Sequence, residues 1–240
     1  MKAIRLAGGR LDSSKNIPRF LGATFLVVIA TSLIAGLFSS VAGTGSISDV
    51  LVNISNDVPL VRIGIIGGMA NSTAIVVLAV LLYAVLSRQN KTMATVALGF
   101  WIIEAAFYAI MQLGALALIP LSKDFVASGA PASSFYQSMG GFLYNDVYQT
   151  GMTIHMWFYC MGGILWYYMF FRSRFVPRPI PAFGIFAVIV GIVGLLIELS
   201  GSDVAMLFFL LILPFELAIG LWLVIKGIDG WPPVEQSRVT

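Results

Sequence analysis

Long apolar segments alternate with short polar ones along almost the whole of this 240-residue sequence. Six segments hold about 20 or more mostly apolar residues, which is the length that an α-helix needs to cross a hydrocarbon core. The two-residue alternation of a barrel strand is absent, and only helices and closed barrels satisfy every backbone polar group in lipid. The pattern predicts an all-α polytopic integral membrane protein, a six-helix bundle with spans at residues 19–38, 61–86, 92–119, 146–171, 181–200 and 205–225.

These spans predict one membrane domain between two polar ends. We expect a basic segment over residues 1–18, the six-helix transmembrane domain over 19–228, and a short tail over 229–240. The first apolar run, Phe20 to Phe38, is longer than the roughly 7 to 15 apolar residues of a signal peptide. We therefore expect it to be retained as a helix.

Lysine and arginine are distributed unevenly among the polar segments. Twelve of the fourteen lie before or at the first residue of the first span, between the second and third, between the fourth and fifth, or after the sixth. Only Arg62 and Lys123 fall on the other side. Because cytoplasmic segments carry the excess of basic residues, both chain ends are predicted to be cytoplasmic.

The overall composition supports lipid as the solvent of this chain. Hydrophobic residues make up 59% and charged residues 10%, whereas roughly a quarter of residues are charged in a soluble domain. The net charge is only +3, and the bases stand at the ends of apolar segments rather than in one patch. This argues against a nucleic-acid partner. The expected partners are membrane lipids and a small lipophilic ligand, and the oligomeric state is left open.

Two predicted external connections, residues 39–60 and 120–145, are long enough to carry structure of their own. In the first, the apolar residues of the stretch Ile47 to Ser55 recur at helical spacing, which predicts a short helix lying in the membrane interface. The second contains aromatic side chains that suit the headgroup level, namely Phe135, Tyr136, Phe142 and Tyr144.

Ionisable residues inside membrane spans are costly and indicate either a function or a partner. Glu104 lies in the third span, His155 in the fourth and Glu216 in the sixth. Asn71 of the second span is expected near the same depth. An isolated carboxylate in hydrocarbon is so unfavourable that we expect both glutamates to be uncharged.

The buried set of Glu104, His155, Glu216 and Asn71 has two interpretations. These side chains hold neighbouring helices together by hydrogen bonds, or they relay protons or coordinate a cation. Two carboxylates and one imidazole can hold a metal, but no metal-ligand motif is present, and we predict neither a metal nor a cofactor. The one cysteine, Cys160, is expected to be a packed thiol.

A second charged set is predicted near the external face. Arg62 begins the second span, Asp146 begins the fourth, and Glu198 ends the fifth. Opposite charges at one level are expected to pair and to pin the outer ends of the bundle. The alternative is that Arg62 binds an anionic or zwitterionic head group.

Small and aromatic residues add two packing expectations. The stretch Gly64 to Gly68 has the small-x-x-x-small spacing that lets two helices approach closely, which we expect within the chain rather than between chains. The fourth span is rich in aromatic residues that either line a ligand cavity or serve ordinary packing and interface anchoring: Tyr148, Trp157, Tyr159, Trp166, Tyr167 and Tyr168.

Several short motifs resemble a known family when their order and spacing are considered together. They are Val61-Arg-Ile-Gly64, Trp101-Ile-Ile-Glu-Ala105, His155, the basic link from Arg172 to Arg178, and the ending from Phe215 to Gly227. This pattern resembles the bacterial membrane family called domain of unknown function 4386. The resemblance implies a multi-pass protein of the bacterial inner (cytoplasmic) membrane and carries no activity with it.

Three functions remain open from the sequence. The first is a binding or transport module that uses Glu104, His155 and Glu216 for a proton-linked small or lipophilic solute. The second is a membrane enzyme that acts on a lipid or quinone at the external face, with Arg62 on the head group. The third is a non-catalytic scaffold or assembly partner. A cavity at the buried polar residues favours the first two, and a closed bundle favours the third.

Overall fold

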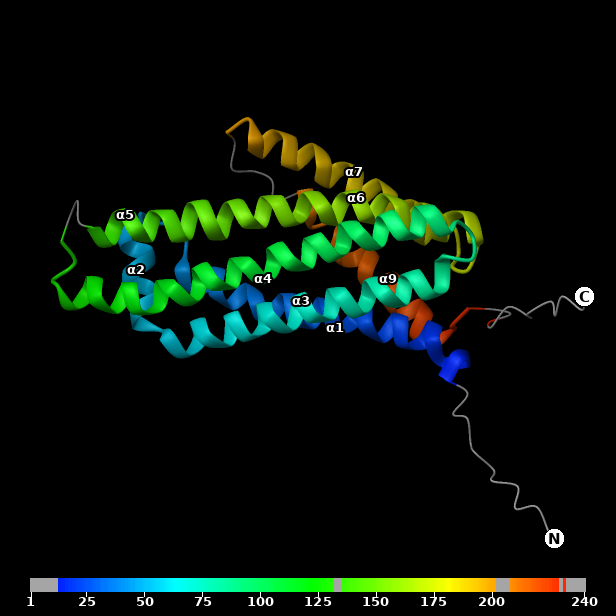
Figure 1. Cartoon of the computed structure of the whole chain (residues 1–240), viewed down its shortest axis with the longest axis horizontal. Helices are drawn as coiled ribbons and strands as arrows, with labels where there is room; N and C mark the ends of the chain where they lie inside the picture. The colour runs from blue at the N-terminus through cyan, green and yellow to red at the C-terminus, as the bar shows by residue number, and fades with distance from the viewer. Residues whose placement is uncertain (1–12, 132–134, 202–207, 229–230, 232–240) are drawn as a thin grey trace, which may run out of the picture.

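The computed structural model describes residues 13–131, 135–201, 208–228 and 231, and these contain helices and no strands. Most of the basic segment 1–18, the start of the sixth predicted span and most of the tail 229–240 lie outside the described residues. In chain order (Figure 1) the helices are α1 (Ser13–Ala42), α2 (Ile47–Asn56), α3 (Val58–Leu86), α4 (Lys91–Ala127), α5 (Phe135–Gly141), the π-helix η1 (Phe142–Gln149), α6 (Thr150–Ser173), α7 (Pro179–Leu199) and α9 (Ile212–Ile225).

Four helices are long and apolar enough to cross a membrane: α1 from Asn16, α3, α4 and α7. The helix α9 is apolar but shorter. The helix α6 has sufficient length, but polar side chains such as Thr153 and His155 make it less apolar. The prediction of an all-helical membrane protein is therefore confirmed, and four of the predicted spans meet both conditions of length and hydropathy.

The long helices and α9 close into a ring. The helix α1 contacts α3 on one side and α9 on the other, α4 lies between α3 and α6, and α7 contacts both α6 and α9. Figure 1 shows α1, α3, α4 and α6 running along the long dimension of the molecule, with α7 and α9 oblique to them. Side chains that point inward from several helices therefore meet at the centre of the bundle.

The helix α4 continues eight residues beyond its predicted end, so the prediction of a loop starting at Pro120 is wrong. Proline removes one backbone donor from a helix, but burial on one face stabilises the turns that follow. Ser122 and Phe125 are fully buried there, and the Ser122 hydroxyl donates to the Ile119 carbonyl at 2.8 Å. This extended end of α4 packs against α2.

The short helix predicted after the first span is present as α2. Ser46 and Asp49 form a reciprocal capping box at its start, which supplies partners for two otherwise unpaired backbone donors. Its apolar side chains Val50, Leu51 and Ile54 are buried in a small core shared with the end of α4 and with η1. The apolar face of α2 is therefore covered by protein.

Glycines allow α1 and α3 to pack closely. A Cβ atom added to Gly64 would lie 2.5 Å from the backbone nitrogen of Phe38, and one added to Gly67 would lie 2.7 Å from that of Ala35. Both distances are too short for any side chain. The expected use of this small-residue stretch for packing within the chain is confirmed.

Candidate functional site

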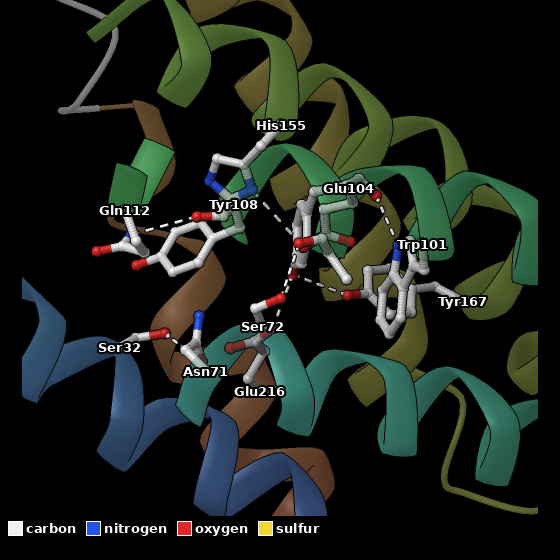
Figure 2. Close-up of polar contacts among 12 residues, drawn as sticks. Ser32, Asn71, Ser72, Trp101, Glu104, Tyr108, Gln112, His155, Tyr167 and Glu216 are labelled. Atoms are coloured by element: carbon white, nitrogen blue, oxygen red, sulfur yellow. Dashed lines mark hydrogen bonds and ion pairs between the residues drawn. The ribbon is translucent and has the colours of Figure 1, made fainter. Parts of the chain in front are cut away.

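Glu104 of α4 and His155 of α6 meet inside the ring of helices. Their side chains come within 3.8 Å, measured from Glu104 Oε1 to His155 Nδ1, and the residues are 1% and 6% exposed. Figure 2 shows the imidazole and the carboxyl reaching toward one another from neighbouring helices. The distance is too long for a hydrogen bond. The sequence prediction that these two residues lie together is consistent with this geometry.

Two enclosed atoms of this pair have no hydrogen-bond partner among the described residues. They are Glu104 Oε2 and His155 Nδ1. Buried side-chain polar atoms are paired in the large majority of cases, and an unpaired one is costly. The pair therefore has the capacity to accept a proton, a water molecule or a polar group that enters the bundle.

Glu216 of α9 has partners of a different kind. The Tyr159 hydroxyl donates to Glu216 Oε1 at 2.9 Å and also lies 2.9 Å from the Tyr167 hydroxyl. All three side chains are buried. The second carboxyl of the predicted set thus joins α9 to α6 through a tyrosine pair.

Asn71 of α3 connects the site to α1. Its side-chain oxygen accepts hydrogen bonds from the Thr31 hydroxyl at 2.8 Å and the Ser32 hydroxyl at 3.2 Å. Tyr108 of α4 interacts with Asn71, and its ring packs edge-on against the His155 ring with centroids 4.8 Å apart. Polar groups from five helices are therefore linked around Glu104 and His155.

The aromatic side chains of Trp101 and Tyr159, on one side of the site, are held in place by close packing. The Trp101 indole donates to the Tyr159 carbonyl at 3.1 Å and stacks on the Tyr159 ring. A Cβ atom on Gly162 would lie 2.3 Å from the Trp101 ring, so only glycine leaves room for it. The Trp166 indole nitrogen nearby is enclosed without a hydrogen-bond partner among the described residues.

Several members of the site escaped the sequence reasoning. Tyr108 and Gln112 of α4 are buried, and Tyr159 and Tyr167 of α6 were assigned mainly to packing. The available signal was spacing: Glu104, Tyr108 and Gln112 recur every four residues, which places them on one face of a helix. The same rule links Tyr159 to His155.

The predicted external charge set does not form an ion pair. Arg62 and Asp146 are exposed, and within the described ranges Arg62 forms an ion pair with neither Asp146 nor Glu198. Glu198 is half-buried on α7, and its carboxylate accepts a hydrogen bond from the Thr153 hydroxyl of α6. We expected an ion pair to hold the outer ends of the helices together, and the structure instead has a hydrogen bond between α6 and α7.

The acidic and imidazole groups of the core do not gather as a metal centre. In the described part of the chain no three His, Cys, Asp or Glu side chains lie close enough to hold an ion. Cys160 is buried and unpaired, as expected for a packed thiol. The arrangement instead suits the transfer or storage of protons between carboxyl, imidazole and phenol groups.

Two hollows lie at the edges of the bundle. One, of about 290 Å³, lies between the start of α1 and the end of α9 and is lined by Arg19 and Lys226 among others. The other, of about 170 Å³, lies between α6 and α7.

The comparisons with known proteins found one family. A family model described as "Domain of unknown function (DUF4386)" matches residues 20–227, which is most of the chain. No curated protein and no solved structure matches it. The match covers every helix that contributes to the buried polar site.

Proposed function

Since the chain belongs to the family of domain of unknown function 4386, whose model spans residues 20–227, we propose a function from its buried site. The protein is a membrane module that binds or transports a small or lipophilic solute, and the cluster of Glu104, His155 and Glu216 links this to proton movement. Glu104 and His155 exchange the proton. Glu216, held by Tyr159, is the second acceptor.

One observation carries the proposal: Glu104 Oε2 and His155 Nδ1 are enclosed yet unpaired among the described residues. Residues that only hold helices together are expected to satisfy one another, as Glu216 and Tyr159 do at 2.9 Å. A buried carboxyl and a buried imidazole that lack hydrogen-bond partners are stabilised when a proton or a polar group binds to them. Intramembrane acid and histidine chains of this kind are typical of proton relays.

The proposal includes a six-span topology in the bacterial inner membrane, with both ends of the chain in the cytoplasm. The closed ring of α1, α3, α4, α6, α7 and α9 supports six passes, because each of these helices has a neighbour on both sides. The placement of twelve of the fourteen basic residues supports the orientation.

Infrared spectroscopy of the purified protein tests the site. Protonated carboxyl bands of Glu104 and Glu216 are identified by Glu104→Gln and Glu216→Gln, which keep size and hydrogen-bonding capacity. The expected result is that the Glu104 band changes between pH 5 and pH 9 and shifts in heavy water, since a relay must exchange protons. Asp146→Asn is the control, because Asp146 is exposed and outside the cluster.

Two outcomes count against the proposal. One is a Glu104 band that is constant over this pH range and does not shift in heavy water. Such a carboxyl does not exchange its proton and serves only as a hydrogen-bonding group between helices. The other is a Glu104 band absent from the protonated region throughout, because an ionised carboxylate at this position without a cation contradicts the expected chemistry. Either outcome would favour the interpretation as a non-catalytic scaffold.

A further inference from the structure

An apolar groove lies between α6 and α7, on the side of α6 away from α4. Figure 1 shows α7 diverging from α6 toward its C-terminal end. The groove has a volume of about 170 Å³ and is lined by Thr153, Ile154, Trp157, Leu195 and Leu199. The surface that lines it is apolar.

A carboxylate stands at the edge of this groove. Glu198 precedes the lining residue Leu199 on α7, and its Oε1 accepts a hydrogen bond from Thr153, another lining residue. No lysine, arginine or histidine of the described residues forms an ion pair with it. A half-buried acid near the membrane boundary with only a neutral partner favours a cation.

The groove also has an aromatic residue in its wall. Trp157 is 39% exposed and contributes its side chain to the lining. The face of an indole attracts organic ammonium ions, and the attraction increases when the cation is partly desolvated. Apolar walls, an indole and a carboxylate together are the chemistry that recognises a cation attached to an apolar body.

We propose that this groove binds a lipophilic amine, meaning an amphiphile with one positively charged ammonium group and an apolar chain. The chain lies between Ile154 and Leu195, and the ammonium group lies between Trp157 and Glu198. An anionic head group would be repelled by Glu198, and a neutral one would leave that carboxylate uncompensated. This assignment names the solute class of the proposed function and rests on that function only for its link to protons.

Binding of radiolabelled decyltrimethylammonium to the full chain in a nonionic detergent tests the assignment. The wild type is expected to bind saturably, and decanol, which has the same chain without the charge, is expected to compete poorly. Glu198→Gln should weaken binding about tenfold, because it removes the charge and keeps the shape. Asp146→Asn should stay within about twofold of wild type, because it removes an exposed acid elsewhere.

The indole is tested with two variants. Trp157→Leu is expected to weaken binding about fivefold, whereas Trp157→Phe should recover most of it, since a phenyl face still attracts a cation. Circular dichroism and thermal unfolding establish that each variant is folded before binding is compared. Equal affinity in wild type and Glu198→Gln, equal competition by decanol, or no saturable binding would each overturn the assignment.

Proton release separates this assignment from the proposed function. Addition of decyltrimethylammonium to weakly buffered wild type should release protons, and Glu104→Gln should still bind the probe saturably but release fewer protons, with an affinity that depends less on pH. Saturable binding without proton release supports the groove and counts against proton linkage at Glu104. Absent binding in a protein whose Glu104 band still titrates overturns the groove alone.

Discussion

Glu104 Oε1 and His155 Nδ1 face each other across 3.8 Å in the core of the bundle, close enough to interact and too far apart to share a hydrogen bond. The gap distinguishes this pair from Tyr159 and Glu216, which are hydrogen-bonded at 2.9 Å. A small movement of α4 against α6 is sufficient to make or break a direct bond. In the proposed function, this pair is the part of the core whose state a solute or proton changes.

The first prediction is that Glu104 and His155 are energetically coupled. Glu104→Gln and His155→Gln each change the free energy of unfolding in detergent, and the double mutant is expected to differ from their sum by about 0.5–3 kcal/mol, the range for residues in contact. Thermal or denaturant unfolding of the four proteins measures this. A sum that agrees within about 0.3 kcal/mol means that the two side chains do not interact.

The second prediction concerns the tyrosine that holds Glu216. Tyr159→Phe removes one hydroxyl and leaves both Glu216 Oε1 and the Tyr167 hydroxyl without this partner. The expected loss is about 1–3 kcal/mol of unfolding free energy, the cost of unpaired buried polar groups. Tyr168→Phe is the control, since that side chain is 40% exposed on the same helix. Equal stabilities of the two variants would show that the hydrogen bonds contribute little.

The third prediction tests the close approach of α1 and α3. Gly64→Ala places a Cβ atom 2.5 Å from the backbone nitrogen of Phe38, so the helices must separate. We expect a loss of about 1–3 kcal/mol, as for other overpacked sites. Gly99→Ala is the control, because nothing lies within 4 Å of its added Cβ atom. The thermal midpoint should fall for the first variant only, and a fall in both would point to glycine itself rather than to the contact.

The fourth prediction is a pH dependence of α2. Hydrogen bonds from the Ser46 side chain and then its backbone N–H lower the pKa of Asp49 from its ordinary value of 3.8. A lowered folded-state pKa means that this stabilisation is complete above the ordinary value and is lost as pH falls through the folded value. Hydrogen exchange of α2 amides, corrected for intrinsic rates, should accelerate below about pH 4.

The control for α2 is Asp49→Asn, which cannot titrate. Its corrected exchange rates are expected to be higher than those of wild type at pH 6 and to change little down to pH 3. If wild type and variant show the same profile, the capping box does not stabilise this helix.

The fifth prediction is topological. Reporter fusions after Arg88, Arg178 and Thr240 should indicate the cytoplasm, and fusions near Ser46 and Ser133 the external side, because cytoplasmic segments carry the excess of basic residues. The matched pair is Arg88, which follows α3, and Ser46, which precedes both α2 and α3 in the chain. A cytoplasmic signal near Ser133 would contradict the six-span proposal.

The hydrophobic pattern was sufficient to predict the long helices, but not the short α5 or all the helix ends. Continuous apolar runs identify α1, α3 and α7, because lipid requires such runs whatever their tertiary contacts. The end of α4 depends instead on burial of Phe125 against α2, a contact between segments far apart in the chain. Pro120 is a local signal for a helix end, and this tertiary contact overrides it.

The candidate site was predictable in its charged members and not in its neutral ones. Glu104, His155 and Glu216 stand out because charge is rare in a span. Tyrosine is common in such helices, so only the fold distinguishes Tyr108 and Tyr159, which face the site, from the exposed Tyr168. The expected pairing of Arg62 with Glu198 is not seen because similar depth does not determine which side of a helix a residue occupies.

The extended α4 has a consequence for the outline of the protein at the membrane. Its 37 residues make a rod of roughly 55 Å, while the hydrocarbon core is about 30 Å thick. Even at a tilt of about 40°, the steepest usual for a membrane helix, more than ten ångströms of it stand clear of the lipid tails. With α2 packed beside that end, this part of α4 is a folded element at the level of the lipid headgroups, which bring the full bilayer thickness to about 40–45 Å.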